Sequence, residues 1–336
     1  MRAVQRKGRG PTFTESCAVP RAPKANSDEV IVRVHAAAIN PVDFKAPKAL
    51  LGPIVGLDVA GVVEQVGAGH TGGLKVGDAV YGTAKGSMAD LVLANARALA
   101  LKPNTATFSV AAALPTAYLT SLQALRDHGG LRAGGRVLII GASGGCGTAG
   151  LQLARRMGAS HVVAVCSAKN AEYVKQHGAH RVIDYTSESI EALFGEQAAD
   201  VDRFDVIYDC ATNSGGGENY KEQALRCLKR PGGQYVAING ALGMWLRLFS
   251  GWGQRQNEHL FLTKVNTADL EHLSSLVDTP GTSGDAATAV KPYVCRLLPF
   301  SDAGVEEGFK LLKSRRTVGK IVFEITRAGR DAPEQM

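Results

Sequence analysis

Hydrophobic residues follow two different patterns along this chain. In the first hundred residues they form short runs rich in valine and isoleucine, separated by turns that contain glycine or proline. Such runs are typical of an all-β unit. The expected strands are EVIVRVHAAAI (29–39), VAGVVEQVG (59–67), GDAVYG (77–82) and ADLVLAN (89–95). Their short, regular spacing predicts a small closed barrel.

The pattern changes to helical spacing near residue 109, and from residue 136 short apolar strands alternate with helical segments. This alternation predicts an α/β domain with a parallel, doubly wound sheet. Strand-like segments return at 292–300 and 320–325, and we assign them to the first domain. The predicted organisation is a first domain at 1–118 completed by 290–328, a second domain at 119–289, and a disordered tail at 329–336. The expected strands of the second domain are 136–141, 161–166, 180–185, 204–210 and 233–240, and its helices 146–157, 170–178 and one near 218–228.

The first strand of the second domain ends in a glycine-rich loop, GASGGCG (141–147). Glycines remove side chains where another group must approach the backbone, and the free N–H groups at a helix start attract an anion. A strand before the loop and a helix after it are the setting of a dinucleotide pyrophosphate site. A tight turn without a ligand is the alternative. The residues expected to bind the pyrophosphate are Ser143, Gly144, Gly145, Cys146 and Gly147.

The residues after the second strand of this domain indicate which dinucleotide is bound. NAD sites place an acidic residue about 20 positions beyond the loop. Here that position is Ser167, followed by Lys169 and Asn170, and no acid is present. A hydroxyl and an ammonium favour a 2′-phosphate, so we predict NADPH, with Tyr185 as a further contact. The alternative for Lys169 is a solvated lysine at a helix start.

Composition excludes several classes of function. The net charge of +7 is spread along the chain, so it gives no evidence for nucleic-acid binding. Six cysteines without a C-x-x-C pair indicate a reducing compartment. Apolar stretches are interrupted by proline, glycine and hydroxyl residues, so we expect no membrane span, and we expect no secretory signal at the N-terminus.

Six segments spread along the chain carry a family resemblance. They are AAAINPVDFK (36–45), VGLDVAGVVEQVG (55–67), VGDAVYG (76–82), AALPTAYLTSLQAL (112–125), GASGGCG (141–147) and VGKIVF (318–323). Together they resemble the medium-chain dehydrogenase/reductase superfamily over nearly the whole chain, which implies a GroES-like β-barrel catalytic domain joined to a Rossmann domain. Zinc alcohol dehydrogenases of this superfamily place a cysteine in the first of these segments and Gly-His-Glu in the second. This chain has Asn40-Pro41 and Gly56-Leu57-Asp58 there, so we expect no metal site.

Within the superfamily, the chain is similar to the zinc-free quinone oxidoreductase group. NPVDFK, CSAKNAEYVKQHGA and VIDY resemble the chloroplast-envelope quinone-oxidoreductase-like proteins and the mitochondrial reticulon-4-interacting proteins. This resemblance implies NADPH-dependent reduction of quinones or α,β-unsaturated carbonyls. The alternatives are an enoyl-thioester reductase and a cofactor-binding protein without turnover.

The resemblance also implies which residues face the substrate. Asn40 and Lys45 are the candidate hydrogen-bond donors to the acceptor, and Asp43 and Thr120 are candidates for holding the nicotinamide. For Asn40 the alternative is a loop-capping role, and for Lys45 an exposed surface position. We expect the thiol of Cys146 to be structural, since only its backbone N–H is needed in the loop.

The segment ALGMWLRLFSGWGQRQ (241–256) is bulky and apolar, with Arg247 and Arg255 in it. It fits a dimer-contact or core helix, and alternatively a lid for lipophilic acceptors that touches a membrane surface. We expect a small, lipophilic conjugated carbonyl or quinone as substrate, and a monomer or homodimer. We expect a cytoplasmic or organellar location, in a plastid or mitochondrion, with no evident cleavable transit peptide and no secretion.

Overall fold

The computed structural model describes residues 1–8, 10–70, 73–190, 203–214, 219–240, 242–250, 256–281 and 288–325. The chain divides into two compact units. Unit 1 contains Met1–Thr116, Val265–Asp278 and Pro292–Met336, and unit 2 contains Ala117–Lys264 and Thr279–Lys291. The domain boundaries of the sequence analysis stay predictions, and the predicted disordered tail at 329–336 lies outside the described residues.

Unit 1 is built on a seven-stranded sheet, in which β14, β15, β3, β4, β5 and β7 follow one another and β6 also pairs with β3. All pairings are antiparallel except that of β14 with β15. A separate hairpin is formed by β1 and β2. The strands are β1 (Ala3–Lys7), β2 (Gly10–Thr14), β3 (Glu29–Ile39), β4 (Asp58–Val66), β5 (Ala79–Thr83), β6 (Leu91–Asn95), β7 (Leu99–Leu101), β14 (Val294–Pro299) and β15 (Lys320–Glu324).

The long strand β3 organises this sheet. Its first half pairs with β6 and its second half with β15, while β4 follows it along nearly its whole length. The C-terminal segment therefore joins the N-terminal strands, as the sequence predicted. Among the described strands no ladder joins β7 to β14, so β7 lies at an edge of the sheet.

The helix α9 (Thr267–Asp278) gives the physical reason for this open edge. Ser274 Oγ donates to the carbonyl of Leu101 on the edge strand β7 (3.0 Å), and the Tyr81 hydroxyl donates to the carbonyl of Leu270. A helix that covers an edge strand is one way to protect its free backbone groups from pairing with another chain. α9 lies in unit 1, whereas the sequence analysis assigned residues 119–289 to the second domain, and that boundary stays a prediction.

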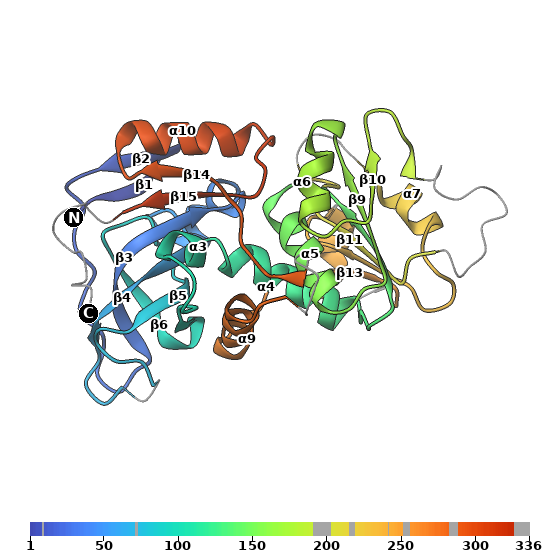
Figure 1. The fold of residues 1–336 in the computed structure, drawn as a ribbon. Coiled ribbons are helices and arrows are strands. Elements are labelled where there is room, and N and C mark those ends of the chain that lie inside the picture. Colours follow the sequence, from blue (N-terminus) through green and yellow to red (C-terminus); the bar gives the residue numbers. More distant parts are fainter. Residues whose placement is uncertain are drawn as a thin grey trace. The chain divides into compact units, whose positions relative to one another are not determined.

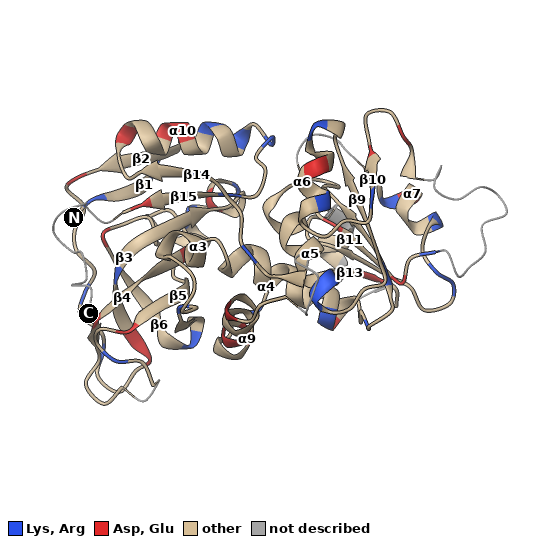
Figure 2. Ribbon diagram, viewed as in Figure 1, with Lys and Arg blue, Asp and Glu red and all other residues tan. Residues whose placement is uncertain are grey.

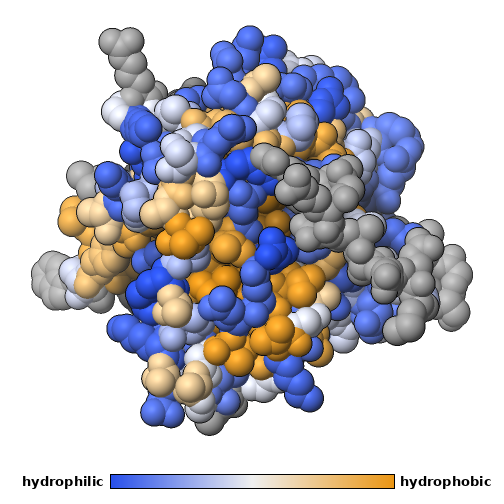
Figure 3. Space-filling view, turned by 90° about the vertical axis from the view of Figure 1, so that its left-hand side faces the viewer, coloured by the Kyte–Doolittle hydropathy of each residue, from blue (hydrophilic) through white to orange (hydrophobic). Residues whose placement is uncertain are grey.

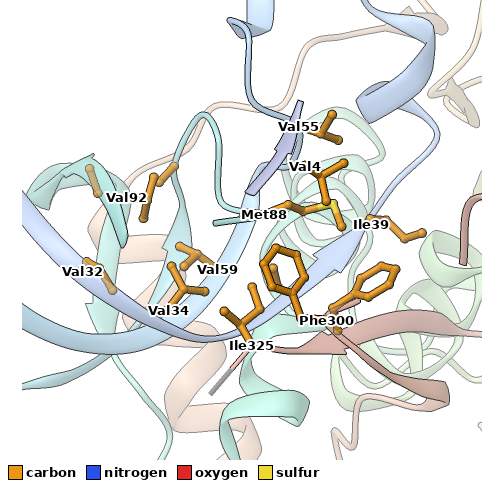
Figure 4. Packing of buried hydrophobic residues seen from close by; sticks show 14 of the residues in the cluster. Val4, Val32, Val34, Ile39, Val55, Val59, Met88, Val92, Phe300 and Ile325 are labelled. Carbon is orange, nitrogen blue, oxygen red and sulfur yellow. The ribbon is translucent and has the colours of Figure 1, made fainter. Parts of the chain in front are cut away.

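Alternating apolar residues of the strands form the core of unit 1. Val32, Val34 and Val59 of β3 and β4 lie in one cluster with Phe300 and Ile325 from the C-terminal segment (Figure 4). All are at most 5 % exposed. Burial of apolar side chains such as these is the main favourable term in folding. The helices of unit 1 are α1 (Val42–Lys45), α2 (Lys48–Leu51), α3 (Phe108–Ala112), α9 and α10 (Asp302–Lys313), with the 3₁₀ turn η1 (Ala96–Ala98).

Unit 2 contains a six-stranded parallel sheet in the order β10, β9, β8, β11, β12, β13. Numbered within the sheet, this is the order 3-2-1-4-5-6 of the dinucleotide-binding Rossmann fold. Figure 1 shows its strands with α5 and α6 beside them. The strands are β8 (Arg136–Ile140), β9 (His161–Cys166), β10 (Arg181–Asp184), β11 (Val206–Asp209), β12 (Gln234–Ala237) and β13 (Glu258–Leu260).

The predicted strands and helices of unit 2 are confirmed within about four residues at each end. The short β13 was missed, because its three residues give no periodic pattern. The helices are α4 (Pro115–Gln123), which begins in unit 1, the π-helix η2 (Ala124–His128), α5 (Gly145–Arg156), the 3₁₀ turn η3 (Ala168–Asn170), α6 (Ala171–Gln176), α7 (Lys221–Arg226) and α8 (Leu242–Ser250).

Some apolar side chains remain on the surface. Figure 3 shows a group of them, surrounded by hydrophilic residues, on the face of unit 1 turned toward the viewer. None of the helices formed by the described residues combines the length and the apolar character that crossing a membrane requires.

Candidate active site

The glycine loop of unit 2 connects β8 to α5. The amides of Gly141 and Ala142 donate to the carbonyl of Val165 on the neighbouring strand β9, each at 3.1 Å, which holds the start of the loop. The first helical bond of α5 runs from the amide of Thr148 to the carbonyl of Gly144 (2.8 Å). By helix geometry, the N–H groups of the first turn have no acceptor within α5. The N-cap Gly144 has no side chain that could accept from them, and a helix end of this kind attracts an anion.

The glycines of the loop have different roles. A Cβ added at Gly147 would lie 2.3 Å from the carbonyl oxygen of Gly141 and 2.6 Å from the Cα of Ala142, so the helix start and the strand end are in backbone contact. Gly141 has a φ of +75°, a conformation that other residues rarely adopt. At Gly144 the nearest atom would be 3.5 Å away, which is ordinary contact. These glycines keep Cβ atoms out of the turn between β8 and α5, and the role of the loop in binding a pyrophosphate stays a prediction.

Three of the predicted cofactor residues lie together beside this loop. The Asn170 side chain donates to Ser143 Oγ (3.1 Å) and to Ser167 Oγ (3.4 Å), which joins the glycine loop to the segment after β9. Lys169 lies exposed in η3 between them. Tyr185 follows β10, is half exposed, and its ring contacts that of Tyr220 at 6.4 Å between centroids. A hydroxyl, an amide and an ammonium thus surround the place where a ribose 2′-phosphate is expected.

The structure adds Asp209, which the sequence analysis did not select. Asp209 ends β11, beside β8, and its carboxylate accepts from the amides of Ala211 and Thr212, each at 2.9 Å, and from the hydroxyl of Tyr235 (2.7 Å). Burial, followed by the charge of Asp209, raises the pKa of Tyr235, so this phenol stays a donor. Asp209 therefore shapes the loop that packs against Gly141, whose added Cβ would lie 3.1 Å from the Cβ of Ala211.

Two other predicted residues of unit 2 have local partners. The Ser121 hydroxyl donates to the carbonyl of Cys146 (2.8 Å) and contacts the hydroxyl of Tyr208 (3.1 Å), which fixes the start of α5. Thr120 is 7 % exposed, and its hydroxyl shares a hydrogen bond with that of Thr263 (2.7 Å). The roles predicted for Cys146 and Thr120 in binding the cofactor stay predictions.

Unit 1 contains a buried ion pair that sequence reasoning missed. Lys320 Nζ lies 2.9 Å from Asp58 Oδ2, and the two side chains are 6 % and 0 % exposed. Asn40 is part of the same network, because its Nδ2 donates to Asp58 Oδ2 (2.9 Å) and its Oδ1 accepts from Lys320 Nζ. Thr116 donates to the other carboxylate oxygen of Asp58 through its amide (3.0 Å) and its hydroxyl. Both ends of the Asn40 amide are therefore engaged inside unit 1.

Asp43 is buried next to this network. Its Oδ2 accepts from the amide of Asn40 (2.7 Å), and the amide of Asp43 donates to the carbonyl of Asn40 (2.9 Å), so the pair closes the turn that starts α1. Burial first, and the charge of Asp58 second among the raising causes, bring the pKa of Asp43 to about 7. The structure gives Asp43 this local role, and its predicted contact with nicotinamide stays a prediction.

Lys45 ends α1 and is exposed. Burial of part of its side chain, and the positive charge of Arg315, lower the pKa of Lys45. A lysine whose charged form is disfavoured in this way is a good hydrogen-bond donor to a developing oxyanion.

The predicted lid segment is described only in part. In α8, Met244 is buried while Leu246 and Phe249 are 60 % and 73 % exposed. Trp245 and Phe249 stack at 6.0 Å between ring centroids. Trp252 and Arg255 lie outside the described residues, as does the Arg247 side chain. The lid, dimer and membrane interpretations of this segment all stay predictions.

Two family models match this chain. One is described as an alcohol dehydrogenase GroES-like domain and matches residues 26–104, and the other as a zinc-binding dehydrogenase and matches residues 177–323. A 2-methylene-furan-3-one reductase of Solanum lycopersicum is 35 % identical over 319 residues, which are 90 % of this chain and 73 % of the relative. The chain belongs to the quinone oxidoreductase branch of the medium-chain dehydrogenase/reductase superfamily. The fold class predicted from the sequence, a GroES-like domain with a Rossmann sheet, is confirmed.

Other members of this superfamily support the same placement. The chloroplastic NADPH-dependent alkenal/one oxidoreductase of Arabidopsis thaliana is 33 % identical over 89 % of this chain and 73 % of its own length. A solved structure, the quinone oxidoreductase from Coxiella burnetii, has a TM-score of 0.79 at 25 % identity and covers 97 % of this chain and 99 % of its own. The chloroplast-envelope and reticulon-4-interacting proteins of the sequence analysis are also among its relatives.

One of the two matching family models is described as a zinc-binding dehydrogenase, but the side chains near Asn40 do not fit a zinc ion. Zinc in proteins is held by three or four thiolate, imidazole or carboxylate ligands. Within the part of the chain that the structure describes, no three His, Cys, Asp or Glu side chains come together to hold a metal ion. The carboxylate of Asp58 already binds the ammonium of Lys320, which would repel a divalent cation.

Proposed function

We propose that this chain is an NADPH-dependent reductase that acts on quinones or α,β-unsaturated carbonyls without zinc. The observation that carries the proposal is the glycine loop at 141–147 before α5, with Ser167, Lys169 and Asn170 beside it and no acidic residue between β9 and α6. This set of groups suits a pyrophosphate and a 2′-phosphate. The alkenal/one oxidoreductase of Arabidopsis thaliana, which is NADPH-dependent by name, supports the choice of cofactor and acceptor.

NADPH supplies a hydride when it is bound, and a conjugated acceptor takes the resulting negative charge onto its oxygen. A quinone or an enone delocalises that charge, so a hydrogen-bond donor is enough to stabilise it where an unactivated ketone needs a Lewis acid. Lys45 is our candidate for this donor. It is exposed, and its lowered pKa favours sharing a proton with an oxyanion.

Asn40 has a different role in this proposal. Because its amide oxygen accepts from Lys320 and its amide nitrogen donates to Asp58, it positions the turn that carries Lys45. We therefore assign Lys45 to contact with the acceptor and treat Asn40 as a positioning residue. Replacing Lys45 by methionine is expected to lower kcat for an enone about 30-fold, an effect of about 2 kcal/mol for one donor to a developing charge.

A panel of acceptors tests the proposal directly. Purified protein is mixed with NADPH and, in turn, a naphthoquinone, an alkenal, a simple ketone and an enoyl thioester. We expect oxidation of NADPH with the first two, no turnover of the ketone, and activity that persists after dialysis against a chelator. Tight binding of NADPH without any turnover would favour a cofactor-binding protein, and loss of activity on chelation would contradict the zinc-free mechanism.

A further inference from the structure

Two cysteines of unit 2 lie beside the glycine loop, one near each end of it. Cys146 is in the first turn of α5, and Cys210 directly follows β11. All six cysteines belong to the described residues, and none of them forms a disulfide. Cys146 and Cys210 are partly exposed, whereas Cys166 and Cys227, the other cysteines of unit 2, are buried.

The packing of α5 on the sheet places these two residues opposite one another. β8 and β11 run parallel and α5 starts where β8 ends, so the first turn of α5 lies at the edge where β11 also ends. One turn further, a Cβ added at Gly150 would lie 3.0 Å from the ring of Tyr208. Cys146 and Gly150 share one face of α5, as Tyr208 and Cys210 share one face of their strand. Cys146 therefore faces Cys210 as Gly150 faces Tyr208.

Hydrogen bonds connect the two residues through Tyr208. The Tyr208 hydroxyl and the Cys210 thiol share a hydrogen bond. The same hydroxyl lies 3.1 Å from Ser121 Oγ, and Ser121 donates to the carbonyl of Cys146 (2.8 Å). The amide of Cys210 donates to the carbonyl of Ile140 (3.0 Å), so the strand pairing extends to Cys210. Both cysteines are thus held around one buried phenol.

The glycine loop lies against both residues. A Cβ added at Gly141 would lie 3.5 Å from the carbonyl carbon of Cys210. One added at Gly147, next to Cys146, would lie 2.3 Å from the carbonyl oxygen of Gly141. In a disulfide the sulfurs are about 2.05 Å apart and the Cα atoms about 4.4–6.8 Å apart. A bond between Cys146 and Cys210 would therefore act directly on the loop that is proposed to bind the pyrophosphate.

The two thiols differ in their surroundings. Burial of the thiol, and after it the charge of Cys146, raise the pKa of Cys210 well above its ordinary value. Cys146 lies where the positive end of a helix favours a thiolate. The first turn of α5 holds no acidic residue that would oppose a negative sulfur, and its basic residues, Arg155 and Arg156, lie in the last turn (Figure 2). These surroundings suit Cys146 as the attacking sulfur and Cys210 as the one that completes the bond.

We propose that Cys146 and Cys210 are a redox pair, whose oxidation by a hydroperoxide to a disulfide blocks the cofactor site. Cys146 attacks the peroxide, the O–O bond breaks, and a sulfenic acid forms while the thiol proton leaves with the alcohol or water. Cys210 then attacks that sulfur, the S–S bond forms, and the sulfenic hydroxyl leaves as water with the proton of Cys210. Two electrons pass in this way from the thiols to the peroxide.

This inference gives the Cys146 thiol a role beyond the structural one expected from the sequence. It rests on the proposed function only for what the disulfide blocks, which is the binding of NADPH at the glycine loop. Formation of the disulfide itself does not depend on that function.

Oxidation of the purified protein with hydrogen peroxide tests the pair. Trypsin releases Cys146 in peptide 137–155 and Cys210 in peptide 204–221, with no other cysteine in either. Mass spectrometry should find these two peptides joined, two hydrogens lighter than their sum, and separated again by dithiothreitol. The Kd for NADPH, measured by calorimetry, should rise about tenfold on oxidation and return on reduction. Bound NADPH should in turn slow the cross-linking, because the coupling is reciprocal.

Cys210→Ala distinguishes the pair from a single reactive thiol. Without its partner, Cys146 should pass on to the irreversible sulfinic acid, so dithiothreitol should reverse no loss of NADPH binding in this variant. Cys17→Ala removes a partly exposed thiol of unit 1, and as the matched control it should behave as the parent protein does.

The outcomes separate this inference from the proposed function. Absence of the joined peptides, joined peptides without a change in Kd, or a loss of binding that dithiothreitol reverses in Cys210→Ala would each overturn the redox pair. Reduced protein that does not bind NADPH would overturn the proposed cofactor, and the joined peptides would still be found.

Discussion

The two candidate sites of this protein use different chemical groups, backbone amides in one and side chains in the other. The glycine loop of unit 2 is proposed to bind through backbone amides, and its residues are neighbours in sequence between positions 141 and 147. The network of unit 1 is made of side chains, in which Lys320 meets Asn40 and Asp58 from 280 and 262 positions away. A backbone site depends on local conformation, whereas a side-chain network depends on the whole sheet that brings its members together.

This difference determines how each site should fail. A change in the glycine loop is expected to weaken ligand binding more than folding. The loop contacts the ligand directly, and the neighbouring elements can fold without the loop. A change in the unit 1 network is expected to lower folding stability more than ligand binding, because the ion pair is buried and each partner neutralises the charge of the other. Four changes test this contrast.

The largest effect is expected from Lys320→Met. It leaves the carboxylate of Asp58 buried without its cation, which typically costs about 3–5 kcal/mol. Hydrogen exchange of the β3 and β15 amides, followed by mass spectrometry, measures the loss within unit 1. The double variant Lys320→Met/Asp58→Asn should recover about half of it. If protection of these strands is unchanged in the single variant, the buried pair does not hold the sheet together.

Asp43→Asn should alter the pH dependence of stability. The pKa of Asp43 is about 7 in the folded protein and near 3.8 when unfolded, so the native state holds the extra proton between these values. Stability of unit 1 should therefore fall as the pH rises from about 4 to 7. The asparagine side chain mimics the neutral form of the carboxyl, so the variant should gain about 2–3 kcal/mol over the parent at pH 8.

The comparison to make is urea unfolding of both proteins at pH 5 and pH 8. The advantage of Asp43→Asn should be small at pH 5 and large at pH 8. A difference that stays the same at both pH values would mean that Asp43 ionises normally in the folded state.

Gly147→Ala tests the backbone site. The new Cβ would lie 2.3 Å from the carbonyl oxygen of Gly141, so the loop must shift and its amides lose their alignment. The Kd for NADPH, measured by calorimetry, should rise about 30-fold, or about 2 kcal/mol. Gly8→Ala, in the hairpin between β1 and β2, is the control, since its Cβ would meet nothing within 4 Å and it lies outside the loop. Equal losses in both variants would contradict this interpretation of the loop.

The same contrast explains what could be predicted from the sequence. The strand-loop-helix period around 141–147, and the absence of an acid near Ser167, are local patterns that predicted the Rossmann sheet and its cofactor. The ion pair of Lys320 with Asp58 has no local pattern, because the two residues meet only through the pairing of β15 with β3 and of β3 with β4. The segment VGKIVF could have suggested it, since a lysine that begins an apolar strand needs a buried partner.

The sequence could not predict which domain α9 joins, for a related reason. TADLEHLSSLVD is an ordinary amphipathic helix in sequence, and nothing in its spacing says which sheet it covers. Its assignment to unit 1 depends on single contacts such as that of Tyr81 with Leu270. Whether a helix forms depends mainly on its local sequence. Which sheet it packs against depends on the strand edges that the rest of the fold leaves uncovered.

The smallest effect is expected from Lys169→Gln, which concerns only the choice between the two nicotinamide dinucleotides. Lys169 is exposed in η3, between Ser167 and Asn170. Removing its charge should take away one charge-assisted contact to a 2′-phosphate, about 1.4 kcal/mol or a tenfold rise in KM for NADPH. KM for NADH should stay within about twofold, because NADH has no phosphate there. Lys175→Gln on α6 removes an equal charge nearby and should change neither value. Equal KM changes for both cofactors in Lys169→Gln would mean that this lysine holds the loop rather than the phosphate.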